Sequence, residues 1–222
     1  MTHVTSSSRG TKARLSLIGA AGRVVSEKGL GGVRIRDIAA EAGVSPAAVL
    51  YHYPETDALM LDVHRAAVDE YVEARRAEQQ RSFDPRHRLV SAVIAGVPPY
   101  TDPGVIKQLY EMHGLARRSS EHAELMSSLW RREHSQYVQV IEDGIRLGYF
   151  APTRKPAEVA RMLLSMEDGL VLHLVSENKH LNPDKVIDTF IHFAEDILHC
   201  SGLVRLSRRL IKDRADAEHE DA

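Results

Sequence analysis

Residues 35–49 read IRDIAAEAGVSPAAV, and this stretch decides the fold. Its first part, 35–42, places apolar side chains on one face of a helix. Gly43 then suits a tight turn that needs a positive φ angle. Ser45 is a strong start for a second helix, because its hydroxyl can accept a hydrogen bond from a free backbone N–H, and Pro46 lacks an N–H where none is needed. Helix, glycine turn and capped helix together predict a helix-turn-helix.

Charge is distributed unevenly around this motif. The chain has 222 residues, with 29 basic against 31 acidic side chains and a net charge of −2. Residues 1–53 nevertheless hold seven basic and three acidic residues, an excess of four positive charges that leaves −6 for the remainder. A basic head on an acidic body is typical of a protein that binds nucleic acid with one end. Motif and charge together predict double-stranded DNA as a partner.

The rest of the chain also has a helical pattern. Apolar residues recur at spacings of three and four, and strand signals are nearly absent, so we expect an all-α protein. The main expected helices cover residues 11–28, 35–42, 56–81, 121–148, 156–177 and 183–202. We expect a three-helix N-terminal domain over 1–55, a helical C-terminal domain over 56–202, and a charged tail over 203–222 that frays. The boundary is expected in the long helix after Pro54, so that the two domains share a helix and are not joined by a linker.

Composition excludes several classes of protein. The longest clean apolar stretch, residues 89–97, is about half as long as the roughly 18 residues that a membrane helix needs. The start of the sequence is polar and lacks the apolar core of a signal peptide, so we expect a cytoplasmic protein. A single cysteine, Cys200, excludes an internal disulfide framework and a zinc site built on cysteine pairs. No motif requires a cofactor.

Around the motif, residues 11–60 resemble the TetR family of transcriptional regulators. The resemblance rests on the apolar first helix, the runs Arg36-Asp37-Ile38-Ala39 and Ala42-Gly43-Val44-Ser45, and the aromatic stretch Tyr51-His52-Tyr53-Pro54. It implies a homodimer that binds a near-palindromic operator, usually as a repressor, and that a small-molecule effector releases. It also implies that the C-terminal domain carries the ligand pocket and the dimer interface.

The second helix of the motif is the element expected to meet the bases. Pro46, Ala47 and Ala48 lie on its exposed start, and such small apolar groups suit thymine methyl groups and a close backbone approach. Val49 and Leu50 are expected to face the core. This face has no Arg, Gln or Asn to read a guanine or adenine, so base specificity is modest or depends on Arg36.

Phosphate contacts would position the protein on the duplex. The candidates for these contacts are Lys12, Arg14, Arg34, Tyr51, His52 and Thr56, with Ser45 as the helix cap. Arg34 and Thr56 depart from the family pattern, which usually has Ser or Thr at the first position and lysine at the second. Because threonine brings no charge, we expect one fewer ionic contact per subunit and a slightly shallower salt dependence.

The last two apolar helices have more apolar surface than one bundle face needs, so we expect them to form the dimer interface. The candidate residues are Met162, Leu163, Leu170, Leu174, Ile187, Phe190, Ile191, Ala194 and Leu198. The same surface can also be the core of the monomer, and we expect both uses to coexist.

Large aromatic and flexible side chains gather on the middle helices, where they could line a pocket for a small-molecule effector. The candidates are Tyr110, Met112, His113, Met126, Trp130, Tyr137 and Met166. Residues of these types at helical spacing are more often ordinary core, which is the alternative here.

Two other classes of protein remain as alternatives. A metal-binding helical enzyme or metal sensor would use the twelve histidines, above all His192, Asp196 and His199, although a hydrated helix face explains that spacing equally and His-Glu-x-x-His is absent. His122 and His134 are interpreted as surface residues paired with neighbouring glutamates. A helical interaction module with no role on DNA is the second alternative.

Overall fold

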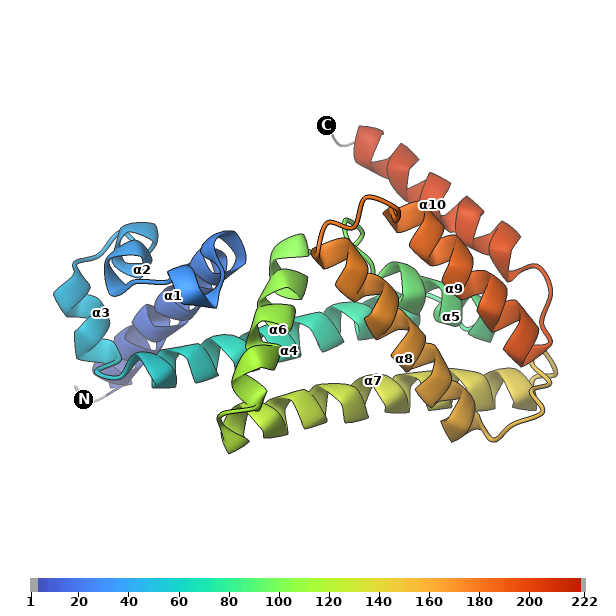
Figure 1. The fold of residues 1–222 in the computed structure, drawn as a ribbon, viewed down its shortest axis with the longest axis horizontal. Coiled ribbons are helices and arrows are strands. Elements are labelled where there is room, and N and C mark those ends of the chain that lie inside the picture. Colours follow the sequence, from blue (N-terminus) through green and yellow to red (C-terminus); the bar gives the residue numbers. More distant parts are fainter. Residues whose placement is uncertain (1–3, 221–222) are drawn as a thin grey trace. The chain divides into compact units, whose positions relative to one another are not determined.

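The computed structural model describes residues 4–220, with side chains for residues 10–216, and every regular element in that part is a helix (Figure 1). In chain order these are α1 (Val4–Lys28), the short 3-10 helix η1 (Leu30–Gly32), α2 (Ile35–Glu41), α3 (Pro46–His52), α4 (Thr56–Gln80), α5 (Pro85–Ile94), α6 (Pro103–Ala116), α7 (Ser120–Arg146), α8 (Pro156–Val175), α9 (Pro183–Leu198) and α10 (Leu203–Glu220). The all-α prediction is confirmed. Within the described residues, no helix combines the length and apolar character needed to cross a bilayer.

The chain forms two compact units, and α4 and α7 contribute to both. The first unit contains the chain up to Tyr71 together with Gly104–Ser127, and the second contains Val72–Pro103 and the chain from Ser128 onward. The boundary lies inside α4, between Tyr71 and Val72, so the two units share the long helix as expected, although they divide further along it than residue 55. The reason is that the first half of α4 buries its apolar stripe in the N-terminal core.

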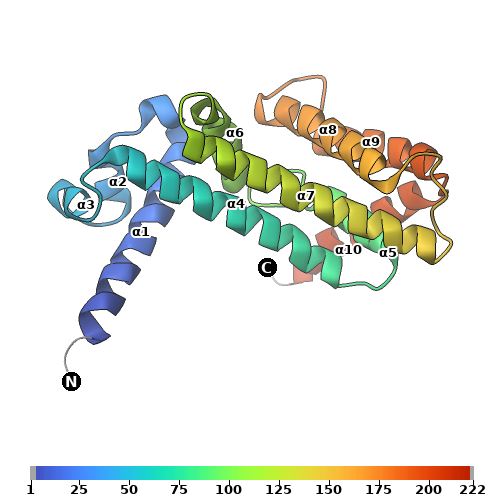
Figure 2. The same ribbon diagram turned by 90° about the horizontal axis from the view of Figure 1, so that it is seen from below.

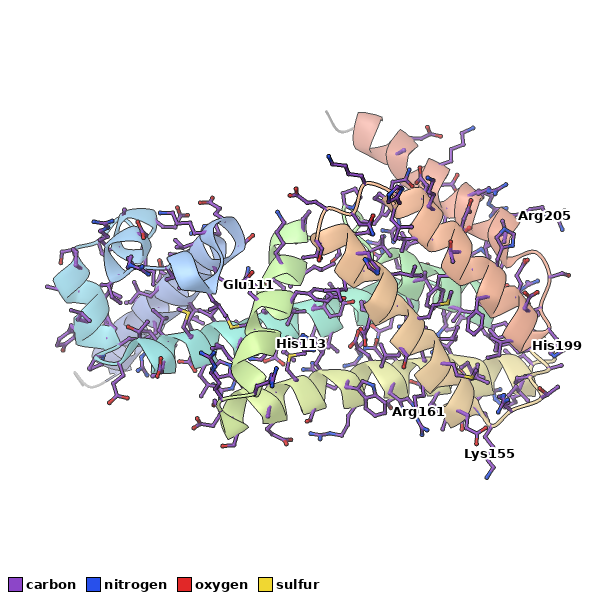
Figure 3. The ribbon with its side chains drawn as sticks, in the orientation of Figure 1. Glu111, His113, Lys155, Arg161, His199 and Arg205 are labelled. Carbon is purple, nitrogen blue, oxygen red and sulfur yellow. The ribbon has the colours of Figure 1, made fainter. Side chains whose placement is uncertain are left out.

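The first unit has one apolar core. α1, α2, α3, α4 and α6 all supply side chains to it, which are Leu17, Ala21, Val25, Ile38, Ala39, Val49, Tyr53, Leu59, Met60, Val63 and Met112. A polar contact also ties α6 to η1, because the Glu111 carboxylate accepts the Leu30 N–H at 2.9 Å. Figure 3 labels Glu111 on α6. The long apolar stripes of α1 and α4 therefore hold the short helices α2 and α3 in place.

The second unit is a helical bundle in which α8 packs on α9, and α10 packs on α9 and α5. The C-terminal halves of α4 and α7 lie side by side in this unit (Figures 1 and 2). Gly144 on α7 lies against the buried ring of Phe150, where a Cβ atom would collide with the ring. Small side chains thus allow close packing at the end of α7.

The C-terminal tail differs from the sequence expectation. Residues expected to fray form α10, and Leu203, Val204 and Ser207 are buried. Arg214 near its end forms an ion pair with Glu78 of α4. The high charge of this segment concealed a narrow apolar stripe that covers the bundle. Residues 221–222 lie outside the described part.

Candidate functional site

The turn between α2 and α3 has the geometry that the sequence predicts. Gly43 adopts a φ of 67°, in the left-handed region that favours glycine. The Ser45 hydroxyl accepts the N–H of the half-buried Ala48 at 3.2 Å, and Pro46 occupies the first position of α3. The helix-turn-helix prediction is confirmed, and its local chemistry is that of a capped helix start.

One face of α3 is exposed to solvent, and its side chains are mostly apolar. Pro46 and Ala47 are exposed, and 83% of the Tyr51 surface is accessible. Val49 is fully buried as expected, but Leu50 is 45% exposed rather than part of the core. In a seven-residue helix only one side reaches the core, and Val49 already occupies it. Leu50 is therefore an additional apolar group on the outward face, which the periodicity alone did not identify.

Some of the positive charge of the head is neutralised within it. Arg23 Nε lies 2.5 Å from Glu41 Oε1, and Lys28 Nζ lies 2.9 Å from Asp37 Oδ1. The hydrogen bond from Lys28 is the main cause of the lowered pKa of the Asp37 carboxyl. The basic residues available for a ligand are consequently those outside these two pairs.

Four of the predicted basic contacts are exposed on the surface of the first unit: Lys12, Arg14, Arg34 and Arg36. Arg34 lies directly before α2, and its Nη1 donates to the carbonyl groups of Gly31 at 3.1 Å and Val33 at 2.8 Å. These bonds hold the guanidinium beside the start of α2, with further N–H donors remaining for an anion.

Arg14 is exposed but also makes contacts within the first unit. Its Nη2 donates to the His52 carbonyl at 3.1 Å, and its guanidinium carbon lies 4.7 Å from the centre of the Tyr53 ring. It thereby ties α1 to the end of α3. The His52 ring meets the Tyr51 ring edge-on at 5.2 Å, and Thr56 is exposed as the first residue of α4. These side chains thus cluster around the end of α3 and the start of α4.

The predicted ligand-binding residues do not form one set. Four belong to the first unit, namely Tyr110, Met112, His113 and Met126, and three belong to the second, namely Trp130, Tyr137 and Met166. Met112 is fully buried in the core of the helix-turn-helix unit, and His113, labelled on α6 in Figure 3, is exposed and stacks on Tyr110. Trp130 is 39% exposed and stacks on His134 at 4.7 Å. Two of the seven meet buried polar groups, and they do so in different units: Met126 contacts His64 in the first unit, and Tyr137 contacts Glu167 in the second.

Two histidines form a buried pair in the first unit, which corrects the expectation that His122 lies on the surface. His64 on α4 is fully buried, His122 on α7 is 5% exposed, and their Nδ1 atoms are 2.8 Å apart. His64 Nε2 lies 3.2 Å from the Met126 sulfur, a weak acceptor, so we assign its proton to Nε2. His122 Nδ1 then donates to His64 Nδ1.

Burial, and to a smaller degree the nearby His122 and His113, lower the pKa of His64 to about 4. The unfolded chain therefore binds this proton more readily than the folded protein, and stability should fall as the pH drops from about 6.5 toward 4. Since a tenfold change in proton affinity is worth about 1.4 kcal/mol, the full loss is roughly 3 kcal/mol.

Urea unfolding between pH 7 and 4.5 should show this loss in the wild type and much less of it in His64→Gln. The exposed His180→Gln variant should keep the wild-type dependence, and equal slopes in all three proteins would contradict the assignment.

The second unit has a buried polar cluster at its centre. Arg75 of α4 is 1% exposed and forms a two-pronged ion pair with Glu167 of α8, in which Nη2 donates to Oε2 at 3.1 Å. Its Nη1 also lies 3.3 Å from Glu133 of α7. The Tyr137 hydroxyl donates to Glu167 Oε2 at 2.6 Å. One guanidinium and two carboxylates thus join three helices in a region removed from water.

The side chains of this cluster are closely packed, and the Glu167 carboxylate places a negative charge among them. Burial and then the Glu167 charge raise the pKa of Tyr137 well above its usual value. A Cβ atom at Gly96 would collide with Glu167 Oε1 and press on Arg75 Nη1. The cluster was missed from the sequence because Arg75 and Glu167 are 92 positions apart.

Most residues predicted for the dimer interface are buried in the chain's own core. Leu163, Ile187, Phe190, Ile191, Ala194 and Leu198 are each at most 1% exposed. These side chains fill the space between α8, α9 and the helices beneath them, which is the use as monomer core that the sequence also allowed. Met162 remains 40% exposed and Leu172, which was not predicted, is 47% exposed. Leu170 and Leu174 are half-buried.

The histidines considered for metal binding are not arranged as ligands. His199 follows the end of α9 in a left-handed conformation, so it does not continue the helical face of His192. Among the described side chains, no group of three or more His, Cys, Asp or Glu is placed to hold a metal ion.

Family models match both parts of the chain. Residues 17–63 match the model described as bacterial regulatory proteins of the tetR family, and residues 85–199 match the model described as BetI-type transcriptional repressor, C-terminal. The second match alone covers more than half of the chain.

Individual proteins are similar over most of their length. The regulatory protein RaaS of Mycobacterium tuberculosis is 29% identical over 189 residues, which are 83% of this chain and 80% of that protein. The regulator BetI of Brucella anthropi is 28% identical over 162 residues, 72% of this chain and 79% of that protein. A transcriptional regulator from Saccharomonospora viridis, crystallised in complex with choline, has the same fold, with a TM-score of 0.77 and 24% identity over 83% of this chain and 96% of that one.

Proposed function

Because this chain belongs to the TetR family of transcriptional regulators, we propose that it is a ligand-responsive repressor that binds a near-palindromic operator as a homodimer. The observation that carries this proposal is the capped helix α3, whose outward face is exposed and almost free of charge beside basic residues on α1 and α2. The family is one of DNA-binding regulators and not of enzymes, and no cluster among the described side chains favours the metal-enzyme alternative.

The side chains of the head divide into two roles on DNA. Ala47 and Leu50 would meet base edges in the major groove, where apolar groups recognise thymine methyls. Tyr51, Arg34 and Thr56 would bind phosphates and set the register without reading sequence. Tyr51→Phe should therefore weaken all DNA sites alike, whereas Leu50→Ala should change the order of preference among sites. Quantitative footprinting on a randomised operator library measures both effects.

For the dimer, we place the interface on the surface of α8 and α9 that the chain itself leaves uncovered. Met162 and Leu172 are the most exposed apolar side chains on α8, and a two-fold axis brings each such patch against its own copy. Burying a charge there in both copies should be strongly unfavourable.

We expect Leu172→Glu to weaken dimerisation on the order of 100-fold while leaving the fold intact, because the side chain is already exposed in the monomer. Sedimentation velocity over a concentration series measures this. Leu147→Glu provides a matched control, since Leu147 is 50% exposed and follows α7, outside α8 and α9. A dimer that is equally stable in both variants would place the interface elsewhere.

For the effector, we propose that the buried cluster of the second unit is the binding site and that an organic cation of the quaternary ammonium type is the ligand. The cluster offers two carboxylates, Glu133 and Glu167. The Tyr137 side chain bonds to Glu167, and the Phe190 ring lies 6.4 Å from the Tyr137 ring. Carboxylates and aromatic faces are the groups with which proteins bind such cations. The choline complex of the S. viridis regulator supports this class of ligand.

Binding would act through Arg75. Its guanidinium carbon lies 5.6 Å from the centre of the Tyr137 ring, and its Nη1 atom contacts the carboxylates of Glu133 and Glu167. It therefore holds the position that an external cation would take. A ligand that displaces it from Glu167 breaks the contact between α4 and α8, and α4 begins directly after the helix-turn-helix. The effector can shift the DNA-binding equilibrium only by its preference for the displaced state.

The experiment compares choline with its neutral isostere 3,3-dimethylbutan-1-ol in a gel-shift assay and by calorimetry. We expect choline to bind and to release the operator, and the isostere to do neither. Glu133→Gln should weaken choline binding about tenfold or more, because it removes one carboxylate from a site with little water. Equal effects of the charged and neutral compounds would exclude a cation site.

A further inference from the structure

A second polar site lies on the surface of the second unit. Figure 2 shows the end of α4, the segment that leads into α5, and the end of α7 in this unit. Side chains from these parts and from the start of α5 line a groove of about 450 Å³. Three arginines, four glutamines and one carboxylate line it, together with two exposed apolar side chains. It shares no residue with the buried cluster around Arg75, and the sign of its charge is opposite to that of the acidic body as a whole.

The arginines of this groove exceed its carboxylates. Asp143 Oδ2 accepts from Arg88 Nη1 at 2.6 Å, and Oδ1 accepts from Arg146 Nη2 at 2.7 Å. One carboxylate thus serves two guanidiniums, which together lower its pKa. Arg76 adds a third positive charge, held only by an exposed pair with Glu73 at 3.8 Å. The groove has a surplus of positive charge because three arginines and one carboxylate line it. The exposed pair of Arg76 with Glu73 contributes little energy, so Arg76 can turn to a ligand at small cost.

Many hydrogen-bond donors remain in the groove. A guanidinium has five N–H donors in a fixed fork that matches a carboxylate or phosphate. In the contacts that the structure describes, Arg88 and Arg146 each direct one nitrogen at Asp143. The side-chain amides of Gln80 and Gln139 line the same groove. These groups can bind an anionic head without a change in the fold.

An apolar surface adjoins the donors. Phe83 is 99% exposed and Leu147 is 50% exposed, and both line the groove. A fully exposed phenylalanine gains nothing from burial in the free protein, whereas a bound hydrocarbon would cover it. Basic and apolar groups in one groove match a ligand that has a charged head and an apolar tail.

We propose that this groove binds an amphipathic organic anion, with its carboxylate or phosphate head on Arg88 and Arg146 and its apolar tail against Phe83 and Leu147. Asp143 competes with the head for the two guanidiniums and holds them in place when the groove is empty. The site is independent of the proposed cation effector, because the two ligands have opposite charge and different contacts.

Isothermal titration calorimetry of the full-length protein tests this with decanoate and decyl phosphate, kept below their micellar concentrations. We expect both to bind at one site per chain, with affinity that falls as salt is added. Decanol lacks the charge, and butyrate and inorganic phosphate lack the tail, so each should bind at least about tenfold more weakly. The stronger of the two decyl compounds identifies the head group. Decanol binding as well as decanoate would overturn the proposal.

Variants separate this site from general surface charge. Arg146→Gln should weaken decanoate about tenfold, and Phe83→Ser should weaken decanoate while leaving the weak binding of inorganic phosphate unchanged. Asp143→Asn should tighten decanoate binding several-fold, because it removes the competing carboxylate. Arg161→Gln, at an exposed position of α8, is the matched control and should bind as the wild type does. Equal losses in Arg146→Gln and Arg161→Gln, or no binding to the wild type, would overturn the proposal.

Discussion

Glu167→Ala is expected to lower the free energy of unfolding by about 3–5 kcal/mol. The variant removes the carboxylate that forms the two-pronged pair with Arg75, and it leaves the Tyr137 hydroxyl without its acceptor. A guanidinium that is 1% exposed cannot recover this loss from water. Chemical denaturation at pH 7 measures the change. The exposed Glu142→Ala variant of α7 should stay within about 0.5 kcal/mol of the wild type.

A double-mutant cycle tests whether Arg75 and Glu167 act as one unit. Arg75→Met should also be strongly destabilising, because it leaves Glu133 and Glu167 buried without the cation between them. The double variant should then lower the free energy of unfolding by clearly less than the sum of the two single variants, since both remove the same interaction. Additive costs would show that the pair does not hold α4 to α8, and the route proposed for the effector would fail with it.

Ala47→Glu is expected to weaken operator binding by about 100-fold or more without loss of stability. Ala47 is exposed on α3, so a longer side chain fits the free protein, but on DNA its carboxylate would lie among phosphates and base edges. Fluorescence anisotropy with a labelled operator measures the affinity, and thermal unfolding checks the fold. Ala77→Glu makes the same change at an exposed position of α4 in the second unit and should bind DNA nearly as the wild type does. Equal affinities for the two variants would mean that α3 does not face the DNA.

The parts of the fold that sequence predicted are those with local causes. The turn at Gly43 and the cap at Ser45 depend on neighbouring residues, so 35–49 alone was sufficient for the helix-turn-helix. Helical periodicity likewise located the long helices. It identified the buried side of α8 and α9, but it could not show whether that side is covered by the same chain or by a second copy. That is why Phe190 and Ile191 were assigned to the dimer interface and lie in the core.

The parts that were not predicted depend on distant residues. His64 meets His122 across 58 positions and Arg75 meets Glu167 across 92, and no local pattern reports such pairings. The groove at the ends of α4 and α7 was missed for a related reason. Its arginines are spread over three segments of an acidic domain, so the average charge concealed a local surplus.

The most direct test of a DNA-binding repressor is the affinity of the purified protein for DNA that flanks its own coding region, measured at two salt concentrations. We predict tight binding to a near-palindromic site that exceeds binding to a scrambled duplex by about 10³-fold or more, and that weakens steeply between roughly 50 and 200 mM salt. Equal affinity for the operator candidate and the scrambled duplex at both salt concentrations would contradict the account.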